Sequence, residues 1–221
     1  MKIKDVYDKF WSKPKTVFED YDRNLVLPTL IPKVTSPLEV LDLGCGDGAV
    51  SDWLIKRGYD VTSLDFNELA LTTAKERHLP NLMLCDAEKP LPFNEAAFDI
   101  VFWGDVVEHL FDPESTLMEI YRVLKSDGCL VMSCPNVGYI GFRFRFLLTG
   151  SIRSLELAGQ EPWEQDHIRF FNSRDLRLLL LKTGFRESRR QGVNRLWHSR
   201  LLAKIIPEVF GYIQVIEAKK L

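Results

Sequence analysis

The sequence lacks an excess of charge of either sign and lacks any long apolar run. Its 29 Lys and Arg residues against 31 Asp and Glu residues leave a formal net charge of −2. Because proteins that bind nucleic acid usually carry a basic excess, this balance makes a nucleic-acid partner an unfavourable prediction. No apolar stretch approaches the roughly 20 residues of a membrane span, so we expect no membrane association. Residues 1–5 lack the apolar core of a signal peptide, which favours a cytoplasmic location.

Cysteine is scarce, and its spacing fits no known framework. Cys45, Cys85, Cys129 and Cys134 form neither a C-x-x-C pair nor the even pattern of a secreted disulfide protein. We predict that all four are reduced packing residues and that no cysteine holds zinc. Cys129 and Cys134 are an odd number of positions apart, so on one strand they would face opposite sides of a sheet. The absence of repeats and the 46% hydrophobic composition fit a single domain over residues 1–221.

What the chain does contain is a glycine-rich turn after a short apolar run. Residues 39–48 read Glu-Val-Leu-Asp-Leu-Gly-Cys-Gly-Asp-Gly, and residues 49–58 have helical spacing. This pattern predicts a strand, a turn and a helix N-terminus, where free N–H groups favour a negatively charged ligand group. The glycine spacing fits neither the dinucleotide fingerprint nor the phosphate loop. The turn therefore indicates a nucleotide-type cofactor that is bound by neither of these two motifs.

Two acidic residues follow at the ends of later apolar runs. Asp65 ends the run 59–66, about 20 residues beyond Gly44, where α/β nucleotide sites place an acid on ribose hydroxyls. Asp86 repeats the pattern in the segment 82–87. Either residue alone could be a helix cap or a solvated loop residue. Both acids lie at the ends of apolar runs, as the glycine turn does, and this shared position favours a common binding site.

These motifs resemble those of the class I S-adenosylmethionine (SAM)-dependent methyltransferases. With Asp42, the turn reads D-x-G-x-G-x-G, which is similar to motif I of that family. Residues 98–110 resemble its fourth motif, F-D-x-V-x-x-x-x-V-x-E-H-L. Residues 122–132 resemble its R-x-L-K-P-G-G-x-L segment, with Ser126 and Asp127 in place of Pro and Gly, and both are turn formers. The resemblance covers about residues 38–136 and implies SAM as cofactor and S-adenosylhomocysteine as product.

The resemblance also implies which residues contact the cofactor. Asp65 would accept hydrogen bonds from the ribose hydroxyls, and Asp86 would face the adenine amino group. The full set of predicted cofactor-binding residues is Asp42, Gly44, Cys45, Gly46, Gly48, Asp65, Phe66, Asp86, Ala87 and Gly104.

Catalysis requires little acid-base chemistry, because SAM carries its own activated methyl group and the protein mainly has to align the nucleophile. A hydroxyl or protonated amine would still have to lose a proton. His109, with Glu108 beside it, follows the fourth strand near the expected methyl position, and His is matched to neutral pH. We predict His109, Glu108 and His167 as catalytic residues. The alternative is that they only pack and cap a helix.

A metal-dependent alternative remains open. Asp105, Glu108, His109 and the later His167 look like the small-RNA 3′-terminal 2′-O-methyltransferases, whose E-x-x-E-H and later His hold a divalent ion. Here Asp105 replaces the first Glu. Such ligands would suit Mn²⁺ or Zn²⁺ better than Mg²⁺. Because the near-neutral charge disfavours RNA, no residue is assigned as a metal ligand at this stage.

The segment 135–172 is longer than an ordinary connection, which favours a functional role. Its sequence, from Pro135-Asn136-x-Gly138 to His167-x-Arg169-x-Phe171, resembles that of the methyltransferase type 11/MetW-like group. The fourth motif, with Asp105-x-x-Glu108-His109, departs from MetW proper. The resemblance implies that 137–172 is a substrate-side insertion, in which four arginines would suit an anionic acceptor, namely Arg143, Arg145, Arg153 and Arg169. Residues 1–35 carry an apolar stripe and are predicted to form a helical lid, with Trp11 and Tyr21 as candidate lid residues.

The expected fold class is α/β: a Rossmann-like class I methyltransferase fold with a mostly parallel seven-stranded sheet, helices on both faces and a C-terminal antiparallel hairpin. Strands are predicted at 39–45, 60–66, 82–87, 98–104, 128–134, 186–193 and 212–219, and helices at 4–12, 17–31, 49–57, 67–77, 113–124, 173–183 and 199–206. The predicted function is methyl transfer to an oxygen or nitrogen of a small polar or anionic metabolite. A SAM-binding partner protein of MetW type is the alternative from another class, so a protein partner or homodimer stays open.

Overall fold

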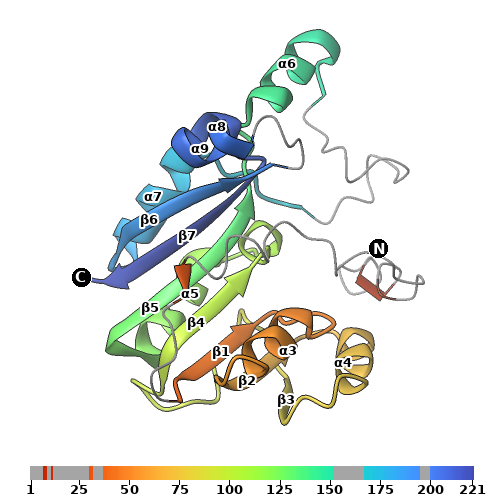
Figure 1. The fold of residues 1–221 in the computed structure, drawn as a ribbon, viewed down its shortest axis with the longest axis vertical. Helices are drawn as coiled ribbons and strands as arrows, with labels where there is room; N and C mark the ends of the chain where they lie inside the picture. Colours follow the sequence, from red (N-terminus) through yellow and green to blue (C-terminus); the bar gives the residue numbers. More distant parts are fainter. Residues whose placement is uncertain (1–6, 9–10, 12–29, 32–36, 152–166, 195–199) are drawn as a thin grey trace.

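A sheet of seven strands forms the centre of the protein (Figure 1). The structure is a computed structural model that describes residues 7, 8, 11, 30, 31, 37–151, 167–194 and 200–221. The strands are β1 (Glu39–Leu43), β2 (Asp60–Asp65), β3 (Asn81–Leu84), β4 (Phe98–Gly104), β5 (Leu124–Pro135), β6 (Phe185–Val193) and β7 (Ile213–Lys220). Their order across the sheet is β3-β2-β1-β4-β5-β7-β6.

The strand directions follow from the alternation of strands and helices along the chain. β1 pairs in parallel with β2 and β4, β2 with β3, and β4 with β5. β7 pairs antiparallel with both β5 and β6, so β7 alone runs against the rest of the sheet. The predicted fold class is confirmed, including the antiparallel pair at the C-terminal end of the chain. Parallel strands place their carboxyl ends at one edge of the sheet, and this is where ligands bind in such folds.

Helices cover both faces of the sheet (Figure 1). In chain order they are α3 (Ala49–Ile55), α4 (Glu68–Lys75), the 3₁₀ turn η1 (Val107–His109), α5 (Pro113–Val123), α6 (Ile140–Thr149), α7 (Ser173–Lys182), α8 (Arg200–Ile205) and α9 (Pro207–Phe210). α5 shows why these segments are helical. Asp112 caps its N-terminus by accepting from the Ser115 N–H, Pro113 begins the first turn, and the buried residues fall on one side.

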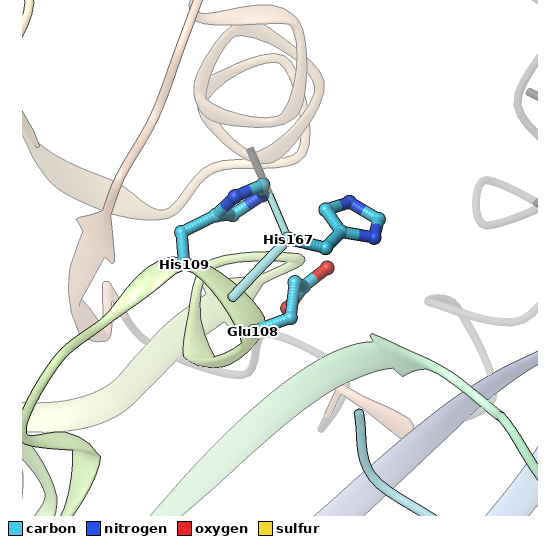
Figure 2. Close-up of side chains that lie close together, drawn as sticks. All are labelled: Glu108, His109 and His167. Carbon is cyan, nitrogen blue, oxygen red and sulfur yellow. The ribbon is translucent and has the colours of Figure 1, made fainter. Parts of the chain in front are cut away.

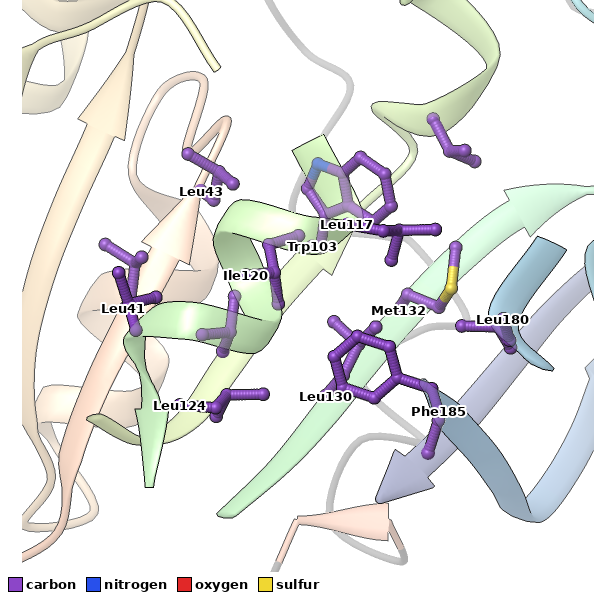
Figure 3. Packing of buried hydrophobic residues seen from close by; sticks show 14 of the residues in the cluster. Leu41, Leu43, Trp103, Leu117, Ile120, Leu124, Leu130, Met132, Leu180 and Phe185 are labelled. Carbon is purple, nitrogen blue, oxygen red and sulfur yellow. The ribbon is translucent and has the colours of Figure 1, made fainter. Parts of the chain in front are cut away.

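The hydrophobic core lies in two clusters, one on each face of the sheet. Figure 3 shows the first, in which Leu117 and Ile120 of α5 and Leu180 of α7 belong to the same cluster as strand residues. Cys134 belongs to this cluster, whereas Cys129 belongs to the opposite one. Both thiols are free, and burial raises the pKa of Cys129 to about 11. The prediction that these two cysteines face opposite sides of one strand is confirmed.

Several boundaries differ from the sequence prediction. β5 begins at Leu124 rather than at 128, so the expected turn at Ser126 and Asp127 is an irregularity within the strand, where the register with β4 shifts. α6 was not predicted, and its alternation Phe-Arg-Phe-Arg-Phe from Phe142 is more typical of a strand than of a helix. Gly150 ends this helix in the left-handed conformation, with φ 66°. Of the predicted helices 4–12 and 17–31, only residues 7, 8, 11, 30 and 31 are described.

Among the described residues, no helix has both the length and the apolar character required to cross a membrane.

Candidate functional site

The predicted cofactor residues gather at the carboxyl ends of four neighbouring parallel strands. The glycine turn follows β1, Asp65 is the last residue of β2, and Gly104 is the last residue of β4. Asp86 and Ala87 lie just beyond the end of β3. Since β3, β2, β1 and β4 are consecutive in the sheet, these residues share one edge. The topology therefore brings together segments that are separated by up to about 60 positions in the chain.

The turn after β1 depends on glycine. Gly44, Gly46 and Gly48 have φ of 80°, 55° and 74°, a region that residues with a side chain rarely adopt. A Cβ atom on Gly44 would lie 2.5 Å from Cγ2 of Val106, the residue just before η1. A Cβ on Gly46 would lie 2.9 Å from the ring of Trp11. The turn therefore fits closely between Val106 and Trp11, with no space for side chains at Gly44 and Gly46.

Asp65 is tied to this turn by its carboxylate. Its Oδ2 accepts a hydrogen bond from the N–H of Gly46 at 2.9 Å, and its Oδ1 accepts from the N–H of Asn67 at 2.9 Å. The side chain is nearly buried. A carboxylate has about four acceptor directions, so these two bonds leave capacity for ligand hydroxyls. The contact of Asp65 with ribose hydroxyls stays a prediction.

Asp42 lies deeper than the sequence prediction suggested. It is buried, and its Oδ2 accepts from Ser51 Oγ at 2.5 Å. Ser51 Oγ in turn accepts from Ser63 Oγ at 2.7 Å. This chain of hydrogen bonds joins β1, α3 and β2 beneath the glycine turn. Direct contact of Asp42 with a cofactor remains a prediction, while its role in holding α3 against the sheet is visible in these contacts.

The turn has a negative electrostatic environment. Burial, followed by the charges of Asp42, Asp65 and Asp47, raises the pKa of the Cys45 thiol. The thiol is therefore neutral at physiological pH. A cluster of carboxylates around a buried turn favours a ligand with positive charge.

Asp86 and Phe66 are more exposed to solvent than Asp65. Asp86 is exposed and its Oδ1 accepts from the Glu88 N–H at 2.9 Å, so a short turn holds its side chain. Ala87 is half-buried, and its carbonyl accepts from Thr116 Oγ1 at 3.1 Å. The ring of Phe66 is 38% exposed. These residues form the outer part of the site, beyond the ends of β2 and β3.

Three described residues of the N-terminal segment lie over this site. The Asp8 carboxylate accepts from Asn67 Nδ2 at 2.8 Å. The ring of Tyr7 lies edge-on to Phe66, with centroids 4.8 Å apart, and 5.6 Å from His109. These contacts support the predicted lid at Trp11 and its neighbours. Tyr21 and most of residues 1–35 lie outside the described residues.

Glu108, His109 and His167 form a second group beside the first. Figure 2 shows the Glu108 carboxylate directed toward the two imidazole rings. One potential ligand atom from each residue lies within 4.8 Å of the others. The two ring centroids are 4.8 Å apart. Glu108 is 1% exposed, whereas both histidines are half-buried. The three predicted catalytic residues are therefore brought together by the fold, although their catalytic role is untested.

Asp105 forms the turn that leads into η1. Its φ is 53°, an unusual value for a residue other than glycine. Its Oδ1 accepts from Ser133 Oγ at 2.6 Å, and its N–H donates to the Ser133 carbonyl at 3.0 Å. Asp105 is therefore turned toward β5 and is not part of the three-residue group. Sequence reasoning placed Asp105 with Glu108 and missed Ser133, for which no motif gave a signal.

The segment from His167 to Phe171 is attached to the end of η1. The N–H groups of Ile168 and Arg169 both donate to the Glu108 carbonyl at 3.0 Å. Arg169 Nε donates to the Leu110 carbonyl at 2.8 Å, and its Nη2 donates to the Phe111 carbonyl. These four bonds hold His167 beside Glu108. The Arg169 guanidinium thus binds backbone carbonyls, whereas sequence reasoning expected it to bind an anionic acceptor; Arg153 lies outside the described residues.

Comparisons with known proteins agree with this geometry. A family model described as a methyltransferase domain matches residues 41–132. A probable S-adenosylmethionine-dependent methyltransferase of Mycobacterium tuberculosis is 30% identical over 162 residues, which is 73% of this chain and 53% of that protein. A ubiquinone biosynthesis O-methyltransferase of Azoarcus sp. is 32% identical over 112 residues, 48% of each chain. The chain spans about half the length of these curated relatives.

Solved structures share the fold. The 1,6-didemethyltoxoflavin-N1-methyltransferase of Burkholderia thailandensis, solved with bound 1,6-didemethyltoxoflavin and S-adenosylhomocysteine, superposes with a TM-score of 0.69 at 18% identity, over 99% of this chain and 87% of that chain. A complex between the Haloferax volcanii Trm112 methyltransferase activator and a methyltransferase gives a TM-score of 0.71 at 17% identity, over 99% and 97% of the two chains. At such identities the likeness concerns the fold alone.

Proposed function

Because this chain belongs to the class I SAM-dependent methyltransferases, we propose that it binds SAM at the carboxyl ends of β1 to β4 and transfers the methyl group to an oxygen or nitrogen of a small polar or anionic metabolite. The observation that carries the proposal is the turn after β1. There, positive-φ glycines present backbone to the site, and the Gly46 N–H is bonded to the Asp65 carboxylate. A turn of this shape accepts a ligand close to the backbone, which a Cβ atom would prevent.

The charges around the turn fit SAM. The α-amino group and the sulfonium are both positive, and the carboxylates that raise the Cys45 pKa supply a negative environment for them. Asp65 would accept hydrogen bonds from the ribose hydroxyls at the end of β2. Phe66, Asp86 and Ala87 would surround the adenine beyond the ends of β2 and β3.

When bound, SAM supplies a methyl group already activated on a positively charged sulfur. The protein's own residues then have to orient the acceptor while its proton leaves. Glu108, His109 and His167 are the described groups suited to that task, because they lie beyond the end of β4, and His109 is linked to Phe66 through the ring of Tyr7. We assign these three residues to the acceptor side of the site.

The acceptor is proposed to be a small molecule rather than nucleic acid, since the net charge of −2 gives no general attraction for a phosphate backbone. The region 136–200 has about twice as many Arg and Lys as Asp and Glu residues, which supports a polar or anionic acceptor. A protein partner is a second proposal, favoured by the fold's occurrence in a complex with the Trm112 activator.

Two measurements test the proposal. Calorimetric titration should show one SAM site per chain, and absence of binding would refute the cofactor assignment. Purified protein should form S-adenosylhomocysteine when a low-molecular-weight metabolite extract is added. Activity with whole lysate but not with its small-molecule fraction would favour the requirement for a protein partner.

A further inference from the structure

We propose that Glu108, His109 and His167 together bind one divalent cation, Mn²⁺ or Zn²⁺, which holds the acceptor's hydroxyl oxygen beside the SAM methyl group. The inference rests on the proposed function and refines it, because a cation of this kind selects an oxygen nucleophile. It takes up the metal-dependent alternative that the sequence left open, with Asp105 outside the ligand set.

The donor set is suited to such a cation. Two imidazole nitrogens and one carboxylate oxygen lie within 4.8 Å of one another. A set of two histidines and one glutamate is one of the ligand sets of catalytic zinc sites, in which a further position stays open for water or substrate. Imidazole ligands also suit Mn²⁺ better than Mg²⁺ or Ca²⁺, which prefer oxygen. A cation held by these three donor atoms would thus keep a coordination position open for one oxygen of an acceptor.

The burial of Glu108 supports the same conclusion. A carboxylate that is 1% exposed needs strong compensation for its lost hydration. A divalent cation between Glu108 and the imidazoles would balance the negative charge directly.

The backbone already holds the three residues in place. Glu108 and His109 are consecutive in η1, and the hydrogen bonds from residues 168 and 169 to the Glu108 carbonyl fix His167 opposite them. Neighbouring ligands of a cation with metal–ligand distances of about 2.0–2.2 Å lie roughly 3 Å apart. The three ligand atoms lie within 4.8 Å of one another, so they would have to approach by up to about 2 Å to bind one cation.

Glu108, His109 and His167 lie close to the proposed cofactor residues, as methyl transfer requires. The Tyr7 ring contacts both Phe66 and His109, so the proposed metal ligand is one aromatic ring away from the proposed cofactor residue. The turn after β1 is also close to η1, because a Cβ on Gly44 would lie 2.5 Å from Val106, the residue just before η1. The proposed cation would therefore lie between the cofactor residues and the segment that begins at His167.

The chemistry then balances without a change in oxidation state. The acceptor hydroxyl binds the cation, which lowers its pKa, and its proton leaves to water. The oxygen lone pair forms a bond to the methyl carbon, and the carbon–sulfur bond breaks with its electron pair remaining on sulfur. The products are the methyl ether, neutral S-adenosylhomocysteine and one proton. In this arrangement the two histidines act as ligands and do not accept the proton themselves.

The test uses the purified full chain, freed of metal by chelation and dialysis, with Mn²⁺ or Zn²⁺ alone as the probe. Calorimetry should show one site, and His167→Asn should weaken binding at least about tenfold. His78→Asn is the matched control, because His78 is exposed and outside the group, and asparagine tolerates its φ of 56°. Glu108→Gln, which preserves side-chain volume, should also weaken binding. SAM affinity should stay within about twofold of the wild type in His167→Asn.

The proposal is overturned if the wild type binds neither cation, or if His167→Asn binds as tightly as the wild type. It is also overturned if methyl transfer continues at an unchanged rate after the metal has been removed. These outcomes are separate from failure of the proposed function, which would appear as loss of SAM binding by the wild type with or without metal.

Discussion

The Asp65 carboxylate accepts a hydrogen bond from the backbone N–H of Gly46 at 2.9 Å, across 19 positions of sequence. This bond connects the end of β2 to the turn after β1, so the two halves of the proposed cofactor site are held by one side chain. The same carboxylate caps the next turn through the Asn67 N–H. Asp65 therefore has a structural role in addition to its proposed contact with ribose.

Gly46→Ala should abolish most SAM binding while Gly58→Ala should not. Both glycines have positive φ, 55° and 88°, so an alanine strains each backbone to a comparable extent, roughly 1–2 kcal/mol. A Cβ on Gly46 would lie 2.9 Å from Trp11, whereas a Cβ on Gly58 meets nothing within 4 Å. We expect at least about a tenfold loss of SAM affinity, near 1.4 kcal/mol, only for Gly46→Ala. Equal affinities by calorimetry would contradict the assignment of this turn.

Asp65→Ala and Asp86→Ala should differ in their effect on stability. Asp65 is buried and bonded to two separate backbone segments, so its loss should lower both the melting temperature and SAM affinity. Asp86 is exposed and bonded only within its own turn in the described contacts, so its loss should lower SAM affinity with little change in melting temperature. Thermal unfolding with and without SAM measures both quantities. Unchanged SAM affinity in Asp86→Ala would refute the proposed adenine contact.

Acid should destabilise the protein partly through Glu187. Burial alone would raise its pKa, but Arg190 and then Arg177 hold it below its ordinary value of 4.5. A depressed carboxylate pKa gives stability that is present above the unfolded-state pKa and is lost as pH falls through the folded-state pKa. The free energy of unfolding should therefore decrease more steeply below about pH 4.5 in the wild type than in Glu187→Gln. Glu208→Gln, at an exposed partner of Arg177, is the control and should follow the wild type.

The cofactor half of the site was predictable from sequence because its chemistry is local. The glycines at 44, 46 and 48 signal their own backbone conformation, and Asp65 and Asp86 end apolar runs that alternate with helical patterns. Parallel strands then place all these ends at one edge. The antiparallel pair at the C-terminal end followed from the short connection between the last two strands and from the family resemblance, whereas the order of the strands was not predicted.

The acceptor half was only partly predictable, because it depends on contacts between distant segments. The E-H pair and His167 are visible in sequence, but the binding of residues 168 and 169 to the Glu108 carbonyl has no local signature. The positive φ of Asp105 and its hydrogen bond with Ser133 also have no local signature in the sequence. α6 was not predicted either, and Phe142 packs against the distant Tyr212, with ring centroids 5.3 Å apart, a contact that has no local signature.

Arg169→Lys should impair turnover of the acceptor through loss of position rather than loss of charge. The guanidinium donates to the carbonyls of Leu110 and Phe111 together, which a single ammonium group does not reproduce. The segment that carries His167 should then loosen, so we expect a reduction in kcat of about tenfold or more, with SAM affinity nearly unchanged. Arg174→Lys is the matched control, because Arg174 is exposed on α7 and should behave as the wild type. If Arg169 bound the acceptor directly instead, Arg169→Lys would mainly raise KM for an anionic acceptor, and metal affinity would be unaffected. A fall in Mn²⁺ affinity alongside kcat would instead show that Arg169 acts by holding His167 against Glu108.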